Sequence, residues 1–175
     1  RKGLLAFDQA TYPAAGSFPS LAREVINRAI NKLRLKNLVS VFGVGQLSSM
    51  TEEDIRGLFN DPRVADAVLE QMQQLLDDPN AKGRYLGFEN AHFIIVDERG
   101  ASELDVSLTA AHELGHALLE EQRNESLANE ALRTRLEKAF EKAKAAQDAP
   151  SAYQGDLGFE EWYADQVGIW AQRLY

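Results

Sequence analysis

Two histidines and a glutamate are grouped in one short run of this chain. His112 and His116 are four residues apart, and Glu113 follows the first histidine directly. On a helix both imidazoles stand on the same face, one turn apart, so one metal ion can bind both. A bound metal lowers the pKa of its water to about 7, and the Glu113 carboxylate is placed to accept that proton. The run therefore predicts a metal-assisted hydrolytic site.

The third protein ligand must come from elsewhere in the chain. The sequence contains no cysteine, so the remaining donors are carboxylates or imidazoles. Catalytic zinc takes three protein ligands in a tetrahedral arrangement and keeps the fourth position for water. A later segment offers Glu160, Glu161 and Asp165 within six residues. We therefore predict a single Zn²⁺ ion whose third ligand lies in this segment.

These two segments together resemble the gluzincin metallopeptidases, in which HExxH is followed on a later helix by Glu-x-x-Ala-Asp. The resemblance implies that Glu161 is the third ligand and that Asp165 supports a ligating histidine, as a carboxylate at i+4 can do. Glu160 points about 100° away on a helix and stays open as the alternative ligand. The metzincin pattern fails, because position 122 is a glutamine instead of a third histidine.

Two further groups have weaker resemblances. Asn90, Ala91 and His92 are similar to the Asn-Ala-aromatic edge-strand signature of thermolysin-like enzymes, which implies contact with an extended peptide substrate. Tyr153 precedes Glu161 by eight residues, similarly to the oxyanion-stabilising tyrosine of those enzymes. His92 as a partly buried strand residue and Tyr153 as a loop aromatic remain alternative interpretations.

Hydrophobic periodicity and turn residues predict the elements that position these side chains. Helices are expected over 21–35, from Thr51 to 60, and over 64–76, 102–121, 125–146 and 157–174, with strands over 38–44, 85–88 and 91–96. The first 19 residues carry no regular pattern. The histidine pair thus falls on the helix over 102–121 and Glu161 on the last helix. The strand over 91–96 precedes the active helix, where the resemblance implies a sheet edge along the cleft.

The expected fold is therefore α+β and zincin-like, with a small sheet, an edge strand over the active-site helix and several covering helices. A chain of 175 residues is long enough for one core, so we predict a single domain over 1–175. The layout resembles the zincin-like domains within polyvalent proteins of phages and mobile elements. Because the chain starts at Arg1 and stops directly after a helix, we expect it to be a segment of a larger protein with flanking domains.

Composition disfavours several other partners. The net charge of −8 and the pI of about 4.9 oppose nucleic-acid binding, which depends on concentrated basic surface. The longest apolar runs, such as 93–96, are too short to cross a membrane, and the first residues lack a signal-peptide pattern. A soluble protein is expected, with its compartment left open.

The sequence therefore favours a zinc-dependent endopeptidase that acts on a protein or peptide substrate. The main alternative is a zinc-stabilised binding module without turnover, because a family resemblance alone does not establish catalysis. A helical scaffold without metal is a third interpretation. The glutamate at position 113 favours the interpretation as an enzyme, since a zinc site without catalytic activity does not require a general base.

Overall fold

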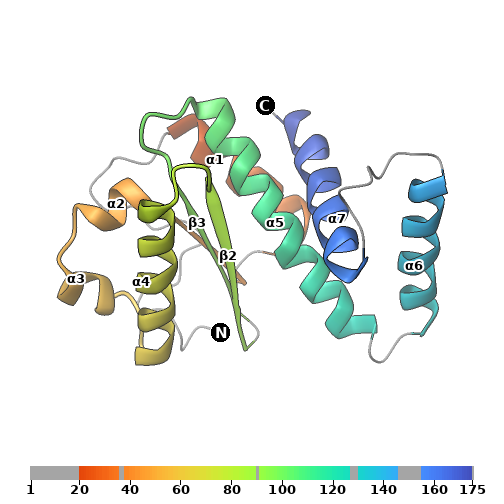
Figure 1. Ribbon diagram of the computed structural model, residues 1–175, viewed down its shortest axis with the longest axis horizontal. Coiled ribbons are helices and arrows are strands. Elements are labelled where there is room, and N and C mark those ends of the chain that lie inside the picture. The colour runs from red at the N-terminus through yellow and green to blue at the C-terminus, as the bar shows by residue number, and fades with distance from the viewer. Residues whose placement is uncertain (1–19, 36–37, 90, 127–129, 146–154, 175) are drawn as a thin grey trace.

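The computed structural model describes residues 20–35, 38–89, 91–126, 130–145 and 155–174. A three-stranded sheet lies between two groups of helices (Figure 1). Its strands are β1 (Val39–Gly43), β2 (Gly83–Phe88) and β3 (Ala91–Val96), in the spatial order β1-β3-β2. β1 runs parallel to β3, and β2 pairs with β3 as an antiparallel hairpin. The chain is thus a mixed α and β fold, as predicted.

The prediction that β3 is the edge strand is wrong. β3 is the central strand, with β1 on one side and β2 on the other, and all six of its residues are buried. β1 and β2 are the strands at the two edges of the described sheet. The physical reason is visible in the residues: β3 is apolar almost throughout, as a strand covered on both faces must be, whereas β2 contains Gly83, Arg84 and Gly87.

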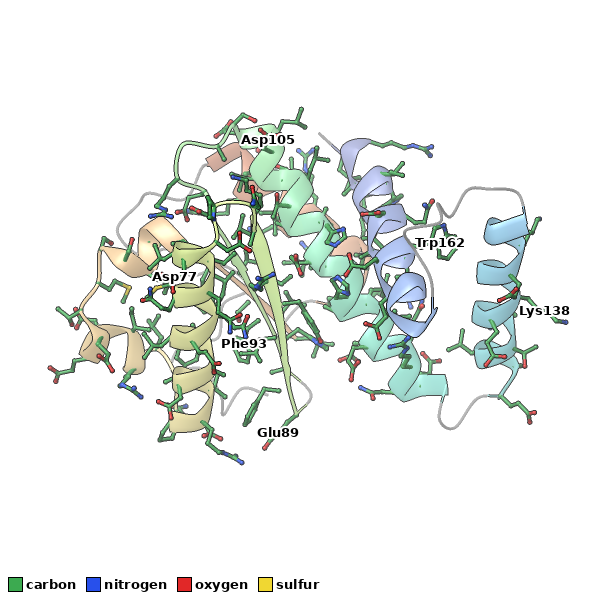
Figure 2. The ribbon with its side chains drawn as sticks, in the orientation of Figure 1. Asp77, Glu89, Phe93, Asp105, Lys138 and Trp162 are labelled. Atoms are coloured by element: carbon green, nitrogen blue, oxygen red, sulfur yellow. The ribbon has the colours of Figure 1, made fainter. Side chains whose placement is uncertain are left out.

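Helices cover both faces of the sheet. α2 (Val44–Ser48), α3 (Glu52–Arg56) and α4 (Pro62–Asp77) pack on one face, around a core that includes Phe42, Phe93 and Ile95. α1 (Ser20–Lys32) and α5 (Glu103–Ser126) pack on the other face. Figure 2 shows Glu89 at one end of the sheet and Asp105, in the first turn of α5, at the other. α5 therefore runs back along the sheet after β3 ends.

Capping residues mark the helix starts as the sequence indicates. The Thr51 hydroxyl accepts a hydrogen bond from the Asp54 N–H at 3.1 Å, and Asp61 caps α4 ahead of Pro62. The Ser102 hydroxyl accepts from the Asp105 N–H at the start of α5. The short helix α2 was not predicted, because five residues are too few to establish a periodicity.

The two remaining helices lie beyond α5. α7 (Gly155–Gln172) packs along α5, and α6 (Glu130–Ala145) lies at the far end of the molecule (Figure 1). The helix predicted over 125–146 overlaps the end of α5, which continues to Ser126, and the structure describes α6 from Glu130 to Ala145. Within the described ranges, no helix combines the length and the apolarity that crossing a bilayer requires.

Candidate metal centre

A close crossing of α5 and α7 brings the predicted ligands together. Gly115 lies on α5 between the two histidines, and a Cβ atom at this position would stand only 2.5 Å from the Cα of Ala164 on α7. Glycine therefore allows the two backbones to approach more closely than any other residue would. Ala164 is flanked along α7 by Glu161, one turn earlier, and by Asp165. The crossing thus sets both carboxylates opposite the histidines.

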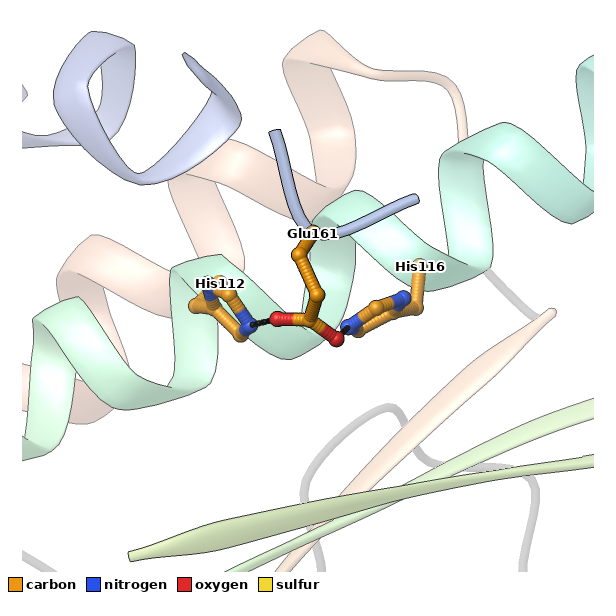
Figure 3. Close-up of side chains that lie close together, drawn as sticks. All are labelled: His112, His116 and Glu161. Atoms are coloured by element: carbon orange, nitrogen blue, oxygen red, sulfur yellow. Dashed lines mark ion pairs between the residues drawn. The ribbon is translucent and has the colours of Figure 1, made fainter. Parts of the chain in front are cut away.

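Three side chains converge at this crossing (Figure 3). The Nε2 atom of His112 lies 3.1 Å from one Glu161 oxygen, and the Nε2 atom of His116 lies 3.3 Å from the other. One ligand atom from each of the three residues lies within 4.8 Å of the other two. Two ligands of a tetrahedral zinc ion, each at about 2.0–2.1 Å from the metal, are about 3.3 Å apart. The spacing therefore suits one metal ion.

Asp165 determines which nitrogen of His112 faces this cluster. Its Oδ1 atom lies 2.8 Å from the Nδ1 atom of His112, and a carboxylate accepts, so Nδ1 carries the proton. In a neutral imidazole Nε2 is then an acceptor, and it faces a Glu161 oxygen that is also an acceptor. Two acceptors at this distance repel each other unless a cation or an additional proton lies between them. The donor set therefore fits a bound cation.

Glu160 has a different partner. One of its carboxylate oxygens lies 2.5 Å from a guanidinium nitrogen of Arg123, near the C-terminus of α5. The structure thus brings Glu161 to the histidines and gives Glu160 an ion pair. A second contact nearby joins the same helices, since the Tyr163 hydroxyl donates to the side chain of Gln122 at 2.6 Å. These two contacts hold α7 against the second half of α5.

Glu113 lies in the cleft beside the ligands. The cleft has a volume of about 610 Å³ and lies between α5 and the start of β2. Its lining comprises Asn80, Ala81, Lys82, Gly83, Arg84, Tyr85, Leu108, Thr109, His112, Glu113, His116 and Glu161. The Glu113 side chain is 8% exposed, and a Cβ at Gly83 would stand 3.2 Å from its Cγ. A glycine on the edge strand therefore leaves the space in which Glu113 sits.

Burial changes the protonation of two groups in this cleft. It raises the pKa of the Glu113 carboxyl to about 7, while His112 and Arg84 act in the opposite direction and Glu161 adds to the rise. Burial also lowers the pKa of His116, against the opposing attraction of Glu161. His116 is therefore favoured in the neutral form, which is the form that binds a metal.

Comparisons with known proteins give no independent indication of function. No protein-family model, curated protein or solved structure matches it. The functional interpretation therefore rests on the residues and their geometry. In the described part of the chain, His112, His116 and Glu161 are the residues that offer a metal a group of three ligands.

Two of the three residues predicted to bind substrate at the sheet edge lie in the central strand instead. Ala91 and His92 are 6% and 1% exposed and belong to the central strand, where both backbone edges are paired. The prediction that they meet a substrate at the sheet edge is wrong, because β2 and β1 occupy the space on either side. Asn90 and the predicted oxyanion residue Tyr153 lie outside the described residues.

The structure adds three site residues that the sequence analysis missed. Tyr85 and Arg84 of β2 line the cleft, and Glu121 of α5 contacts the buried His92. A sequence signal for Tyr85 exists, because a two-residue hairpin loop sets Phe88 opposite Ala91 and therefore places Tyr85 on the same sheet face as His92. No spacing in the sequence indicates Glu121, whose contact depends on how α5 lies across the sheet.

Proposed function

We propose that this chain is a zinc-dependent endopeptidase that hydrolyses peptide bonds with Glu113 as the general base. The observation that carries the proposal is the convergence of two imidazoles and one carboxylate at the crossing of α5 and α7. A buried carboxylate of raised pKa lies in the same cleft. Perturbed titratable groups around a metal-binding cluster in a cleft are characteristic of active sites.

The donor set favours zinc over magnesium and calcium. Two imidazole nitrogens and one carboxylate oxygen form the His₂Glu set of catalytic zinc sites, which leave a fourth position open. Magnesium and calcium prefer sites made only of oxygen ligands. Asp165 supplies the outer contact that fixes the orientation and tautomer of His112. The four residues together support one Zn²⁺ ion at this position.

Glu113 performs the proton transfers in this proposal. Zinc at the site would polarise the scissile carbonyl and acidify a water molecule. Glu113 takes the proton of that water as it attacks the carbonyl carbon, and then gives the proton to the departing amine. Burial opposes the charged form of this carboxylate, which favours its acceptance of a proton. The burial of Glu113 also keeps bulk water from competing for the proton.

The edge strand β2 supports an extended peptide as the substrate. The Asp97 N–H donates to the Lys82 carbonyl, so the even-numbered residues of β2 pair with β3. The backbone groups of Gly83, Tyr85 and Gly87 therefore point away from β3, and no strand of the described residues pairs with them. An extended chain that adds to this edge would lie along the cleft that holds Glu113.

Glu113→Gln tests the proposal. The variant keeps all three metal ligands but has no base, so we expect wild-type zinc content and a loss of about 10²- to 10⁴-fold in peptide cleavage. The measurement is zinc content per chain together with digestion of a broad peptide library followed by mass spectrometry. Glu125→Gln is the matched control, because Glu125 is exposed on the same helix and remote from the cleft.

The same experiment separates the enzyme from the binding module. Cleavage by wild type and Glu125→Gln but not by Glu113→Gln supports the endopeptidase. Zinc bound by wild type without cleavage of any peptide supports the zinc-stabilised binding module instead. Cleavage at the wild-type rate by Glu113→Gln would remove Glu113 from the role of base.

A further inference from the structure

The two histidines of the proposed metal centre are oriented by different means. His112 has a carboxylate partner, because its Nδ1 atom donates to Asp165 at 2.8 Å. Within the described residues, no hydrogen-bond partner faces the Nδ1 atom of His116. The His116 imidazole instead lies against the ring of Tyr85, with 6.0 Å between the ring centroids and an angle of 24° between the planes. One ligand is thus held by a hydrogen bond and the other by ring stacking.

Tyr85 is itself held in place by a buried histidine. Its hydroxyl lies 2.7 Å from the Nδ1 atom of His92, and the two rings stack at 5.7 Å. The His92 side chain is 1% exposed. Gly87, two residues along β2, leaves the space for this hydroxyl, since a Cβ there would stand 2.7 Å from it. The phenol is therefore held by a hydrogen bond at its hydroxyl and by stacking of its ring on His92.

A carboxylate on the active helix completes the chain of contacts. The Nε2 atom of His92 lies 2.7 Å from a carboxylate oxygen of Glu121 on α5. Because this carboxylate accepts, Nε2 carries the proton, Nδ1 accepts, and the Tyr85 hydroxyl donates. The order of contacts is Glu121, His92, Tyr85 and then His116. It begins and ends on α5 and passes through both strands of the hairpin.

We infer that Tyr85 is a positioning residue for the metal ligand His116, and that His92 and Glu121 hold Tyr85 in that position. The physical basis is the freedom of a histidine ring about χ2, which is broad and poorly restricted without a neighbour. A flat ring held parallel to the imidazole removes that freedom, so Nε2 stays directed at the metal position. The inference rests on the metal site proposed above.

Metal affinity measured on variants of the tyrosine tests the inference. We expect Tyr85→Leu to weaken Zn²⁺ binding by about tenfold or more, as outer contacts of metal ligands do. We expect Tyr85→Phe, which keeps the ring but loses the hydroxyl, to weaken it less. The measurement is competition with a chelator of known affinity, together with the visible absorption spectrum of the Co²⁺-loaded protein, which reports ligand geometry. Phe88→Leu is the matched control, because it makes the same aromatic-to-leucine change on β2 at a ring that lies against Arg63 and the core on the other face of the sheet.

A double-mutant cycle tests whether Glu121 acts on His116 through Tyr85 or independently of it. Glu121→Ala should weaken Zn²⁺ binding in the wild-type background and have no further effect in the Tyr85→Leu background. Glu121 is partly exposed on α5, so Glu121→Ala keeps the inference testable even if Tyr85→Leu does not fold. Circular dichroism of the metal-free variants shows whether each is folded.

The outcomes separate this inference from the proposed function. Wild-type Zn²⁺ affinity and an unchanged Co²⁺ spectrum in folded Tyr85→Leu would overturn the role of Tyr85. Additive effects of Glu121→Ala and Tyr85→Leu would overturn the role of Glu121. If the wild-type protein binds neither metal, the proposed metal centre itself fails.

Discussion

Adjacent glutamates on α7 have different partners, although they belong to the same short motif. Glu161 lies between the two histidines, and Glu160 pairs with Arg123. Helix geometry shows that the two side chains diverge by about 100°. It does not determine which side chain faces α5, because that depends on the rotation of α7 about its axis. The sequence could therefore predict His112 and His116 from spacing, but the choice between the glutamates required the packing.

The contacts among Tyr85, His92 and Glu121 also depend on how the elements pack. Tyr85, His92 and Glu121 come from three elements, and their contacts depend on the strand order and on the position of α5 over the sheet. Spacing along the chain reveals partners within one element, as for the ligand pair, or across a short hairpin, as for Tyr85 and His92. It does not reveal the contact of His92 with Glu121, because that contact joins a strand to a helix.

A buried carboxylate distant from the metal centre gives a pH prediction. Glu98 is 8% exposed, and one of its oxygens accepts from the Gly45 N–H while the other has no partner. Burial raises the pKa of this carboxyl, so the folded state favours the protonated form. Its contribution to stability is complete below the unfolded pKa of about 4.5 and is lost as the pH rises through the folded value. Glu98→Gln stays neutral and avoids this loss.

We therefore expect Glu98→Gln to gain stability relative to wild type as the pH rises from 4 to 7. The measurement is the free energy of unfolding in urea at several pH values, with both proteins stripped of metal by a chelator. Since the glutamine oxygen still accepts from Gly45, the change removes only the ionisation. A difference in unfolding free energy that stays constant over this range would contradict the assignment.

At the scale of elements, local signals were reliable where a residue marks a boundary. Thr51 and Ser102 begin helices where predicted, because side-chain caps act within one turn. α4 was expected from 64 and begins two residues earlier, at Pro62 behind the Asp61 cap. The region after Glu121 carries no glycine or proline before 150, and the boundary between α5 and α6 was misplaced there. Strong helix formers on both sides of a boundary give no signal of where it lies.

The close crossing of α5 and α7 predicts that adding one methyl group at Gly115 lowers both stability and Zn²⁺ affinity. Gly115→Ala would place a Cβ atom 2.5 Å from the Ala164 Cα, so the helices must separate. We expect a loss of about 1–3 kcal/mol in stability, as for other insertions into a packed core. We also expect weaker Zn²⁺ binding, because Glu161 moves away from the histidines. Chemical denaturation and chelator competition measure the two effects.

Gly168→Ala is the matched control for this prediction. Gly168 is buried on α7 facing α5, but the nearest atom to a Cβ there is the His112 backbone nitrogen at an ordinary 3.9 Å. The alanine should fit and should stabilise the helix by about 0.5–1 kcal/mol, with no change in Zn²⁺ affinity. Equal effects of Gly115→Ala and Gly168→Ala on Zn²⁺ affinity would contradict the claim that the close approach at Gly115 places Glu161 opposite the histidines.

At the scale of the whole molecule, α5 is the shared support of the sheet and the metal centre. One part of its surface packs on β2 and β3, and another packs on α7. The mixed α and β class was predictable from the order of helical and strand patterns. The strand order was not, because the strand that precedes the active helix in the sequence turned out to be central. The continuous burial of Ala91–Val96 now explains its apolar sequence.

This arrangement predicts how a substrate would pair with the protein. The outward backbone groups of β2 recur at every second residue. Binding of a cleaved peptide should therefore depend on every second N–H group of the peptide backbone. N-methylation of single backbone nitrogens in a cleaved peptide should raise KM by about three- to tenfold at alternate positions, the size of one lost hydrogen bond. A KM that is insensitive to N-methylation at every position would exclude pairing along this edge.

Zinc stoichiometry of two neighbouring variants tests the central claim most directly. Glu161→Gln and Glu160→Gln make the same change one residue apart on α7, and only the first replaces a proposed carboxylate ligand by a neutral, weaker amide. The proposed centre predicts one zinc per chain for wild type and for Glu160→Gln, measured by elemental analysis after dialysis against a weak chelator, and a loss of most of that zinc from Glu161→Gln. Full zinc content in Glu161→Gln, or its loss from Glu160→Gln alone, would contradict the proposed ligand set.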